Sequence, residues 1–366
     1  MKKTLLAAAL ALGFTGVAQA ETSVTLYGVI DTGIGYQKVE NANGTDAKKF
    51  GLVNGVQAGS RWGLRGTEDL GNGLQAVFQL ESGFDSSTGI SSQGFGAQNR
   101  LFGRQATIGL RSDSWGRLDL GRQTNIASKY FGDVASPFGA SFGQANVGAT
   151  FGSANTVRWD NMVMYQTPNF SGFQFGIGYS FNTNGPQNWD VDGFDENNNK
   201  GITAGLRYAN GPIAVALTYD QIKNDANTGV QDVTVKAWNI GGSYDFEVVK
   251  LHLGFGQTKD GWINAYGYGG GVASAATYFD DYEANLYTAG LSAPLGGGRL
   301  MASWAMADID DIGPVEFEKQ QIYSLGYTYA LSKRTNVYSY ASYAKNLYGA
   351  DDTKSTVVGV GLRHQF

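Results

Sequence analysis

The chain ends in a strand whose two faces differ sharply in character. Its apolar face carries Val358, Val360, Leu362 and Phe366, with His364 among them. The other face begins with Val357 and continues with Gly359, Gly361, Arg363 and Gln365, which are small or polar. This alternation is the two-residue period of an extended strand. The strand ends on an aromatic residue, without a polar tail to cover a sheet edge. This pattern favours a closed barrel with lipid on its outside and water on its inside.

The composition supports a membrane barrel rather than a soluble enzyme. The 366 residues include 53 Gly, 20 Tyr and 20 Phe but only 6 Pro. Glycine and aromatic residues fit short strands whose rings gather at the two membrane interfaces. Cysteine is absent, so a secreted form of this chain must be held by its core or by barrel closure. The formal net charge of −5 argues against nucleic-acid binding.

The first twenty residues have the features of a secretory signal peptide. Lys2 and Lys3 precede an apolar run over residues 5–17, and Ala18-Gln-Ala20 is a small-residue cleavage motif. We expect residues 1–20 to be removed and residues 21–366 to form one domain. A buried N-terminal helix is the alternative. No later apolar run approaches eighteen residues, which argues against helical membrane spans.

From residue 21 onward the sequence alternates strands with connections. We count about sixteen strands, an even number as in bacterial barrels. Short turns, such as residues 70–73 and 210–212, alternate with longer polar stretches, such as residues 38–54. The longest connection, residues 124–155, falls between the fifth and sixth strands, and a connection of that length is usually functional. The predicted fold class is all-β, a transmembrane antiparallel barrel of about sixteen strands.

Strand alternation predicts which charged residues face the water-filled lumen. Trp62 and Leu64 share one face of their strand, so Arg61 and Arg65 should point inward. The same reasoning turns Glu81 inward. An arginine that faces lipid at the membrane midplane costs ~2–4 kcal/mol, which supports these assignments.

The strand over residues 156–166 is less regular. If Val157 and Trp159 face lipid, Arg158 and Asp160 face the lumen. The same parity places two methionines, at positions 162 and 164, on the wet side. Arg104 shares a face with Ala106 and Ile108, and the alternation alone leaves its direction open.

Several segments, spread over nearly the whole chain, resemble the trimeric general porins of Gram-negative outer membranes, of the neisserial and burkholderial type. They are Val24-Thr-Leu-Tyr-Gly-Val-Ile-Asp31, Ser60-Arg-Trp-Gly-Leu-Arg-Gly-Thr-Glu-Asp-Leu-Gly71, Phe78-Gln-Leu-Glu-Ser-Gly83, Leu101-Phe-Gly-Arg-Gln-Ala106, Leu120-Gly-Arg-Gln123, Tyr165-Gln-Thr-Pro-Asn-Phe-Ser-Gly172, Tyr329-Ala-Leu-Ser-Lys-Arg334 and Gly361-Leu-Arg-His-Gln-Phe366. The resemblance implies a sixteen-stranded barrel in the outer membrane, a homotrimer, and a long third loop folded into the pore. It also implies that the barrel-assembly machinery reads the Phe366 strand.

The resemblance further implies a pore constriction. It places Arg104 in the lumen, where Arg61, Arg104 and Arg158 would form a basic wall facing the inserted loop, and it makes Asp31 lumen-facing. General porins often carry Pro-Glu-Phe-Gly in that loop, whereas this chain reads Ser136-Pro-Phe-Gly139.

Without that glutamate, the loop has one acidic residue between residues 124 and 155, which is Asp133. A channel wall of one charge sign selects ions of the opposite sign, so we predict a passive channel with a modest anion preference. The alternative is that the arginines only pair with carboxylates for stability.

Two further motifs point elsewhere. Gly139-Ala-Ser-Phe-Gly143 matches the nucleophile motif of hydrolases, but the strand-turn-helix context is missing and the chain has only two histidines. We therefore expect no enzyme activity and no cofactor or metal, with a barrel lipase or protease as the alternative. Acidic residues recur at 190–196, 278–282 and 308–311. We expect solvated loops there; the alternative is divalent-cation binding that bridges lipopolysaccharide.

Overall fold

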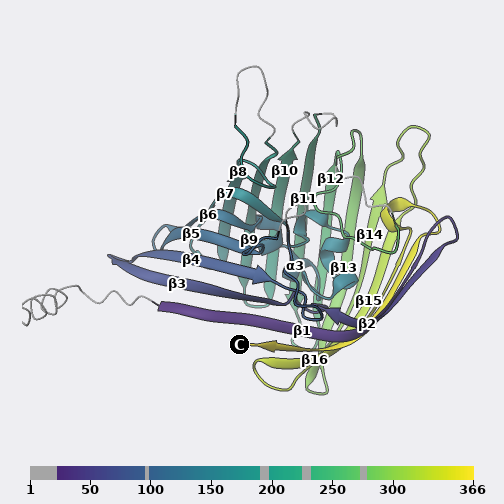
Figure 1. The fold of residues 1–366 in the computed structure, drawn as a ribbon, viewed down its shortest axis with the longest axis horizontal. Coiled ribbons are helices and arrows are strands. Elements are labelled where there is room, and N and C mark those ends of the chain that lie inside the picture. The colour runs from purple at the N-terminus through teal and green to yellow at the C-terminus, as the bar shows by residue number, and fades with distance from the viewer. Residues whose placement is uncertain (1–22, 95–98, 190–197, 225–231, 273–277) are drawn as a thin grey trace, which may run out of the picture.

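The computed structural model describes residues 23–94, 99–189, 198–224, 232–272 and 278–366. They form one antiparallel sheet that closes on itself, as the ring of long strands in Figure 1 shows. In chain order the strands are β1 (Ser23–Glu40), β2 (Asp46–Asn54), β3 (Arg61–Gly71), β4 (Leu74–Gly83), β5 (Gln105–Ser112), β6 (Gly116–Thr124), β7 (Arg158–Gln166), β8 (Phe173–Ser180), β9 (Lys200–Asn210), β10 (Ile213–Lys223), β11 (Thr234–Asp245), β12 (Lys250–Lys259), β13 (Glu283–Leu295), β14 (Gly298–Ile309), β15 (Gln320–Ala330), β16 (Thr335–Lys345) and β17 (Lys354–Gln365). The short helices are α2 (Ile126–Tyr130), α3 (Gly132–Ala135), η1 (Gly143–Ala145), η2 (Val147–Ala149), η3 (Gly152–Ala154) and η5 (Leu347–Gly349).

The seventeen strands of the described residues fill sixteen barrel positions. The first half of β1 pairs with β3, and its second half pairs with β2 on the same side. β2 and β3 are therefore two halves of one barrel strand, interrupted at residues 55–60. The prediction of a sixteen-stranded antiparallel barrel is confirmed.

The final strand closes the barrel, as its sequence pattern predicts. β17 pairs with β1 from Val29↔Gln365 to Glu40↔Lys354. The backbone of Phe366 continues this pairing, because Gly28 and Phe366 exchange two backbone hydrogen bonds of 3.0 and 3.1 Å. Leu362 is half exposed on the outer face, and Gly359 is buried on the inner one.

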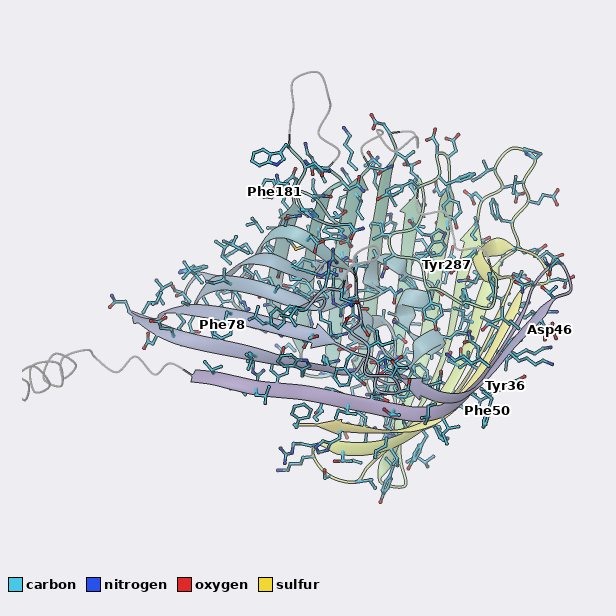
Figure 2. The ribbon with its side chains drawn as sticks, viewed as in Figure 1. Tyr36, Asp46, Phe50, Phe78, Phe181 and Tyr287 are labelled. Atoms are coloured by element: carbon cyan, nitrogen blue, oxygen red, sulfur yellow. The ribbon has the colours of Figure 1, made fainter. Side chains whose placement is uncertain are left out.

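One predicted loop is wrong. Residues 38–54 are not a polar connection, because β1 continues to Glu40 and β2 begins at Asp46. Backbone hydrogen bonds hold this hairpin whatever the polarity of its side chains. Phe50, 77 % exposed, and Leu52 lie on the outer face of β2, and Figure 2 shows Phe50 there. The lysines before them obscure the alternation in the sequence.

Exposure alternates along the strands with the period expected of a membrane barrel. In β10, Val215, Leu217 and Tyr219 are exposed, whereas Ala216 and Asp220, at the alternate positions, are fully buried. Water lies inside and lipid outside in such barrels, so large apolar side chains are exposed on the outer face. Among the described residues, no helix is long and apolar enough to cross a membrane.

The connection between β6 and β7, residues 125–157, packs against the inner face of the sheet. We call it the inner segment. It carries α2, α3 and η1–η3, which contact strands from β8 to β16, and Figure 1 shows α3 inside the ring of strands. Glycines make room for it: a Cβ added at Gly241 would lie 2.9 Å from both Ala135 and Phe131.

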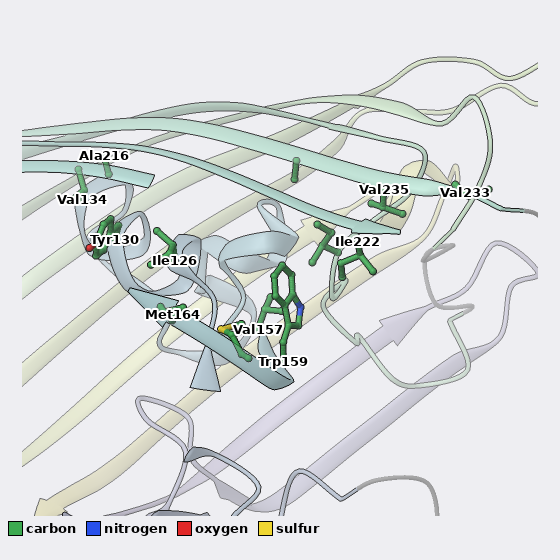
Figure 3. Close-up of a cluster of buried hydrophobic side chains, with 13 residues drawn as sticks. Ile126, Tyr130, Val134, Val157, Trp159, Met164, Ala216, Ile222, Val233 and Val235 are labelled. Carbon is green, nitrogen blue, oxygen red and sulfur yellow. The ribbon is translucent and has the colours of Figure 1, made fainter. Parts of the chain in front are cut away.

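The inner segment also explains the irregular strand β7. Contrary to the prediction, Val157 and Trp159 do not face lipid. They are buried with Met162, Met164 and Ile126 in an apolar cluster, shown in Figure 3. The pairing of β6 with β7 shifts register between Gly121 and Gln123, and this irregularity changes the parity of β7. The methionines are therefore covered by protein rather than by water.

Candidate pore constriction

Polar anchors tie the inner segment to the barrel wall. Asn125 Nδ2 donates to Asp220 Oδ1 at 2.7 Å and to the backbone oxygen of Ser153 at 2.8 Å. The backbone N–H of Ile126 donates to Thr203 Oγ1 at 2.8 Å. Because Asp220 and Thr203 belong to β10 and β9, the start of the segment is fixed against two neighbouring strands.

The middle of the segment is held in the same way. Gln144 Nε2 donates to Ser342 Oγ at 3.1 Å, and His252 Nδ1 lies 3.0 Å from the backbone oxygen of Val134. His252 therefore faces inward and is buried beneath α3. The inner segment spans the barrel from β9 to β16.

The other arc of the inner face, from β3 to β7, carries the predicted arginines. Arg104 Nε donates to Glu81 Oε1 at 2.6 Å, and Arg61 Nε lies 3.5 Å from Glu81 Oε2. Tyr27 also donates its hydroxyl to Glu81. Two arginines thus share one buried carboxylate, which leaves one positive charge uncompensated.

Arg158 adds a third cation to this group. Its Nη1 donates to the backbone oxygen of Thr156 at 3.0 Å, and its Nε has no hydrogen-bond partner among the described residues. It is close enough to Arg104, Arg122 and Arg61 to be repelled by all three. The structure thus brings together the three arginines that the sequence analysis combined.

Arg100 and Arg122 enlarge the group and were not singled out from the sequence. Arg122 Nη1 binds Asp160 Oδ1 and Arg100 Nη2 binds Asp160 Oδ2, each at 2.6 Å. We call Arg61, Arg100, Arg104, Arg122 and Arg158 the arginine wall. Among the described residues, four of these five arginines pair with two carboxylates, Glu81 and Asp160, so within this group the arginines outnumber the carboxylates by three.

Strand alternation in the sequence does not predict that Arg122 faces inward. Leu120 is exposed on the outer face, so strict alternation would turn Arg122 toward lipid. The cost of a lipid-facing arginine is the signal that could have corrected the parity. Gly121 has a φ of +118° at the register shift, a backbone conformation that glycine readily adopts.

Three other predicted residues lie apart from the arginine wall. Asp133 is exposed on α3, near His252 and over β11 and β12. Arg65 points inward, with its guanidinium carbon 5.3 Å from the centre of the Tyr27 ring. Phe366 lies at the β1–β17 closure, 43 % exposed.

Asp31 points inward but does not line a lumen. It is fully buried beneath the break between β2 and β3. Ala58 donates its backbone N–H to Asp31 Oδ2 at 2.7 Å, and Tyr338 donates its hydroxyl to Asp31 Oδ1 at 2.5 Å. Asp31 therefore connects β1, β16 and the break between β2 and β3.

The inner segment contributes one basic residue, Lys129 of α2. It is half-buried near the ion pair of Arg117 with Asp119. Burial lowers the pKa of Lys129 to about 8, because desolvation penalises its charged form. The sequence offered no sign of this shift.

A recess of about 680 Å³ opens beside the arginine wall. Arg122, Arg158 and Thr183 line one part of it, and Asn155 and Tyr266 line another. Among the described residues there is no group of three or more His, Cys, Asp or Glu that could hold a metal ion.

The acidic loops have partners of their own where they are described. Asp308 pairs with Lys319 at 2.6 Å, and Asp311 accepts the backbone N–H of Phe317. The acidic stretch at 190–196 lies outside the described residues. Cation bridging of lipopolysaccharide by these loops stays a prediction.

A closed sixteen-stranded barrel with an apolar exterior and a basic inner wall defines a bacterial outer-membrane channel. The model of the Gram-negative porin family matches residues 6–364, so the chain belongs to that family.

Its relatives agree with this assignment. The chain is 58 % identical to an outer membrane porin protein of Bordetella pertussis and 33 % identical to outer membrane porin protein 32 of Delftia acidovorans, each over the full length of both chains. Among solved structures it resembles an anion-selective porin from Comamonas acidovorans, with a TM-score of 0.73 and 30 % identity, over 94 % of this chain and 100 % of that one. The protein is an outer-membrane porin and not an enzyme.

Proposed function

We propose that this porin is a passive diffusion channel for small hydrophilic solutes and ions, with a modest anion preference set by the arginine wall. The observation that carries the proposal is the excess of three positive charges on one arc of the inner face. The solved porin from Comamonas acidovorans, which is described as anion-selective, supports the same sign.

The inner segment is the second half of the proposed constriction. It covers the inner face of the strands from β8 to β16, whereas the arginine wall belongs to the arc from β3 to β7. A solute would pass between the two surfaces. Asp133 is the only acid of the inner segment between residues 124 and 155, so little negative charge faces the wall.

The size of the effect follows from Coulomb's law. One uncompensated charge about 7 Å from the ion path in water changes an ion's energy by ~0.6 kcal/mol, with opposite signs for chloride and potassium. The ratio of the two ions then changes by about sevenfold per charge before salt screening. A Debye length of ~8 Å reduces this energy to about 0.4 of its value, so the ratio changes by about twofold per charge and by about tenfold for three charges, which is a preference rather than strict selectivity.

Assembly belongs to the same proposal. We include a homotrimer, removal of residues 1–20 on export, recognition of the Phe366 strand by the barrel-assembly machinery, and contact with lipopolysaccharide and outer-membrane lipid. The pairing of Phe366 with Gly28 at the closing seam supports a role for this strand in barrel completion.

Zero-current potentials in a planar bilayer under a KCl gradient test the anion preference. We expect the wild-type potential to have the sign of anion selectivity, and Arg158→Gln to shift it toward zero. Arg334→Gln, at an exposed turn between β15 and β16, removes the same charge away from the wall and should leave the potential unchanged. A wild-type potential of cation-selective sign would refute the proposal.

A further inference from the structure

A row of lysines crosses the outer face of the barrel near its long-loop end. Lys223 is the last residue of β10, Lys259 is the last of β12, and Lys236 is near the start of β11. Each has the strand parity of exposed apolar residues, as Lys236 has with Ile240 and Lys259 with Leu253. Since short turns face the periplasm in these barrels and long loops face outward, the lysines lie at the level of the outer leaflet's headgroups.

The lysines stand opposite one another in the strand register. Lys236 of β11 is directly across from Lys259 of β12. Like charges that face each other across two strands destabilise a sheet. Such a pairing at the end of the β11–β12 hairpin fits a surface that binds an anion.

Carboxylates of the chain compensate this charge only in part. Lys259 Nζ pairs with Glu283 Oε2 at 2.9 Å, and Glu283 also accepts a hydrogen bond from Gln257. Lys223 and Lys236 form no ion pair with any residue that the structure describes. The exposed ammonium groups can therefore bind a further anion.

An apolar groove of about 500 Å³ lies further down the same strands. Its floor includes Gly242 and Ala289, and its walls include Leu253, Tyr287 and Trp304. A Cβ added at Gly242 would meet only one atom within 4 Å, the backbone oxygen of Ala214 at 3.8 Å. The groove is thus a real depression in the lipid-facing surface.

The spacing between lysines and groove matches one membrane leaflet. Six residues separate Lys236 from Gly242, which is roughly 20 Å along a strand. At the usual strand tilt of about 40°, this corresponds to a depth of about 15 Å, half of the ~30 Å hydrocarbon core. An acyl chain whose headgroup lies at the lysines would end in the groove.

We propose that the outer face of β10–β13 is a binding site for a phosphorylated lipid of the outer leaflet, with its phosphate on Lys236 and Lys259 and one acyl chain in the groove over Gly242. Phosphate supplies the missing negative charge, and juxtamembrane lysines bind anionic lipid headgroups in this way. The site deepens the lipopolysaccharide contact included in the proposed function. It lies outside the lumen, so the sign of ion selectivity does not bear on it.

Lipid binding to the full porin, refolded without lipid in detergent, tests the site. The probe is bisphosphorylated lipid A, titrated and counted by native mass spectrometry. We expect Lys236→Gln with Lys259→Gln to weaken binding by about 25-fold, and Gly242→Leu, which fills the groove, to weaken it by about tenfold. Dephosphorylated lipid A should bind the wild type as weakly as lipid A binds the double variant, and inorganic phosphate should not compete.

Matched variants separate this site from general effects. Lys345→Gln with Lys354→Gln removes another directly opposed pair, on β16 and β17, and Ser339→Leu adds an apolar side chain to the outer face of β16. Both should change the affinity less than twofold. Equal loss in the two lysine double variants, or full competition by inorganic phosphate, would overturn the proposal. So would dissociation of the oligomer by Gly242→Leu, which would show that a second copy fills the groove.

Discussion

Two neighbouring glycines of β11 allow a direct test of how the inner segment packs. Gly241 faces inward, and a methyl group added there would lie 2.9 Å from Ala135 and from the Phe131 ring. Gly242 faces outward into open space. Gly241→Ala and Gly242→Ala therefore add the same group at adjacent positions, with the inner segment on one side only.

The expected difference follows from the contacts. Phe131 is fully buried and packs on Phe151 with ring centroids 5.0 Å apart, so it cannot move aside freely. Overpacking at such a site costs ~1–3 kcal/mol. Alanine in place of glycine in a strand gains ~0.5–1 kcal/mol, and this gain applies at both positions, so it cancels in the comparison. The two variants should therefore differ in the free energy of unfolding by about 2 kcal/mol.

Guanidinium unfolding in detergent, followed by tryptophan fluorescence, measures this difference as a shift in midpoint at constant m-value. Single-channel conductance should change for Gly241→Ala alone, because the added methyl group displaces α3. Phe131→Leu should restore part of the stability in the Gly241→Ala background, since residues in contact couple. Equal midpoints and equal conductance for the two glycine variants would refute the packing described here.

Four further predictions concern charge and anchoring. Because the pKa of Lys129 is lowered to about 8, anion preference should fall as the pH rises from 7 to 9, and Lys129→Met should abolish that step in zero-current recordings. The same shift makes the unfolded chain hold this proton more tightly between pH 8 and about 10.4, so Lys129 should add stability as the pH rises through that interval, as measured by unfolding of wild type against Lys129→Met. Tyr338→Phe, which removes the hydroxyl on buried Asp31, should lower stability by about 2 kcal/mol without changing the zero-current potential. Glu81→Gln should increase anion preference, whereas Asp310→Asn, in an exposed outer loop, should leave it unchanged.

The barrel could be predicted from the sequence because its signal is local. In β17 and β10, apolar residues alternate with small or polar ones because one face of each strand contacts lipid and the other faces the barrel interior. This pattern does not depend on which strands are neighbours. The hairpin of β1 with β2 was missed for the converse reason. Its lysines, such as Lys48, suit the water at the strand end rather than the lipid of the membrane. The sequence of this strand therefore resembles that of a polar loop.

The constriction could be predicted only in part because it depends on distant contacts. Parity placed Arg61 and Glu81 correctly, since β3 and β4 are regular there. It failed at Trp159 and Arg122, where the register shift between β6 and β7 exchanges the two faces. The two methionines of β7 were the clue: apolar residues on an inward face indicate that something covers that face, and the inner segment does.

Position, rather than total charge, determines what such a channel prefers. The chain has a formal net charge of −5, yet its arginine wall has an excess of three positive charges. Charges separated by more than about 8 Å of physiological salt solution barely interact, so acids on the outer loops do not offset cations in the barrel. Glu81→Gln and Asp310→Asn change the net charge equally and differ only in distance from the ion path. Their comparison therefore separates a constriction that acts locally from a field that acts through the protein's overall charge.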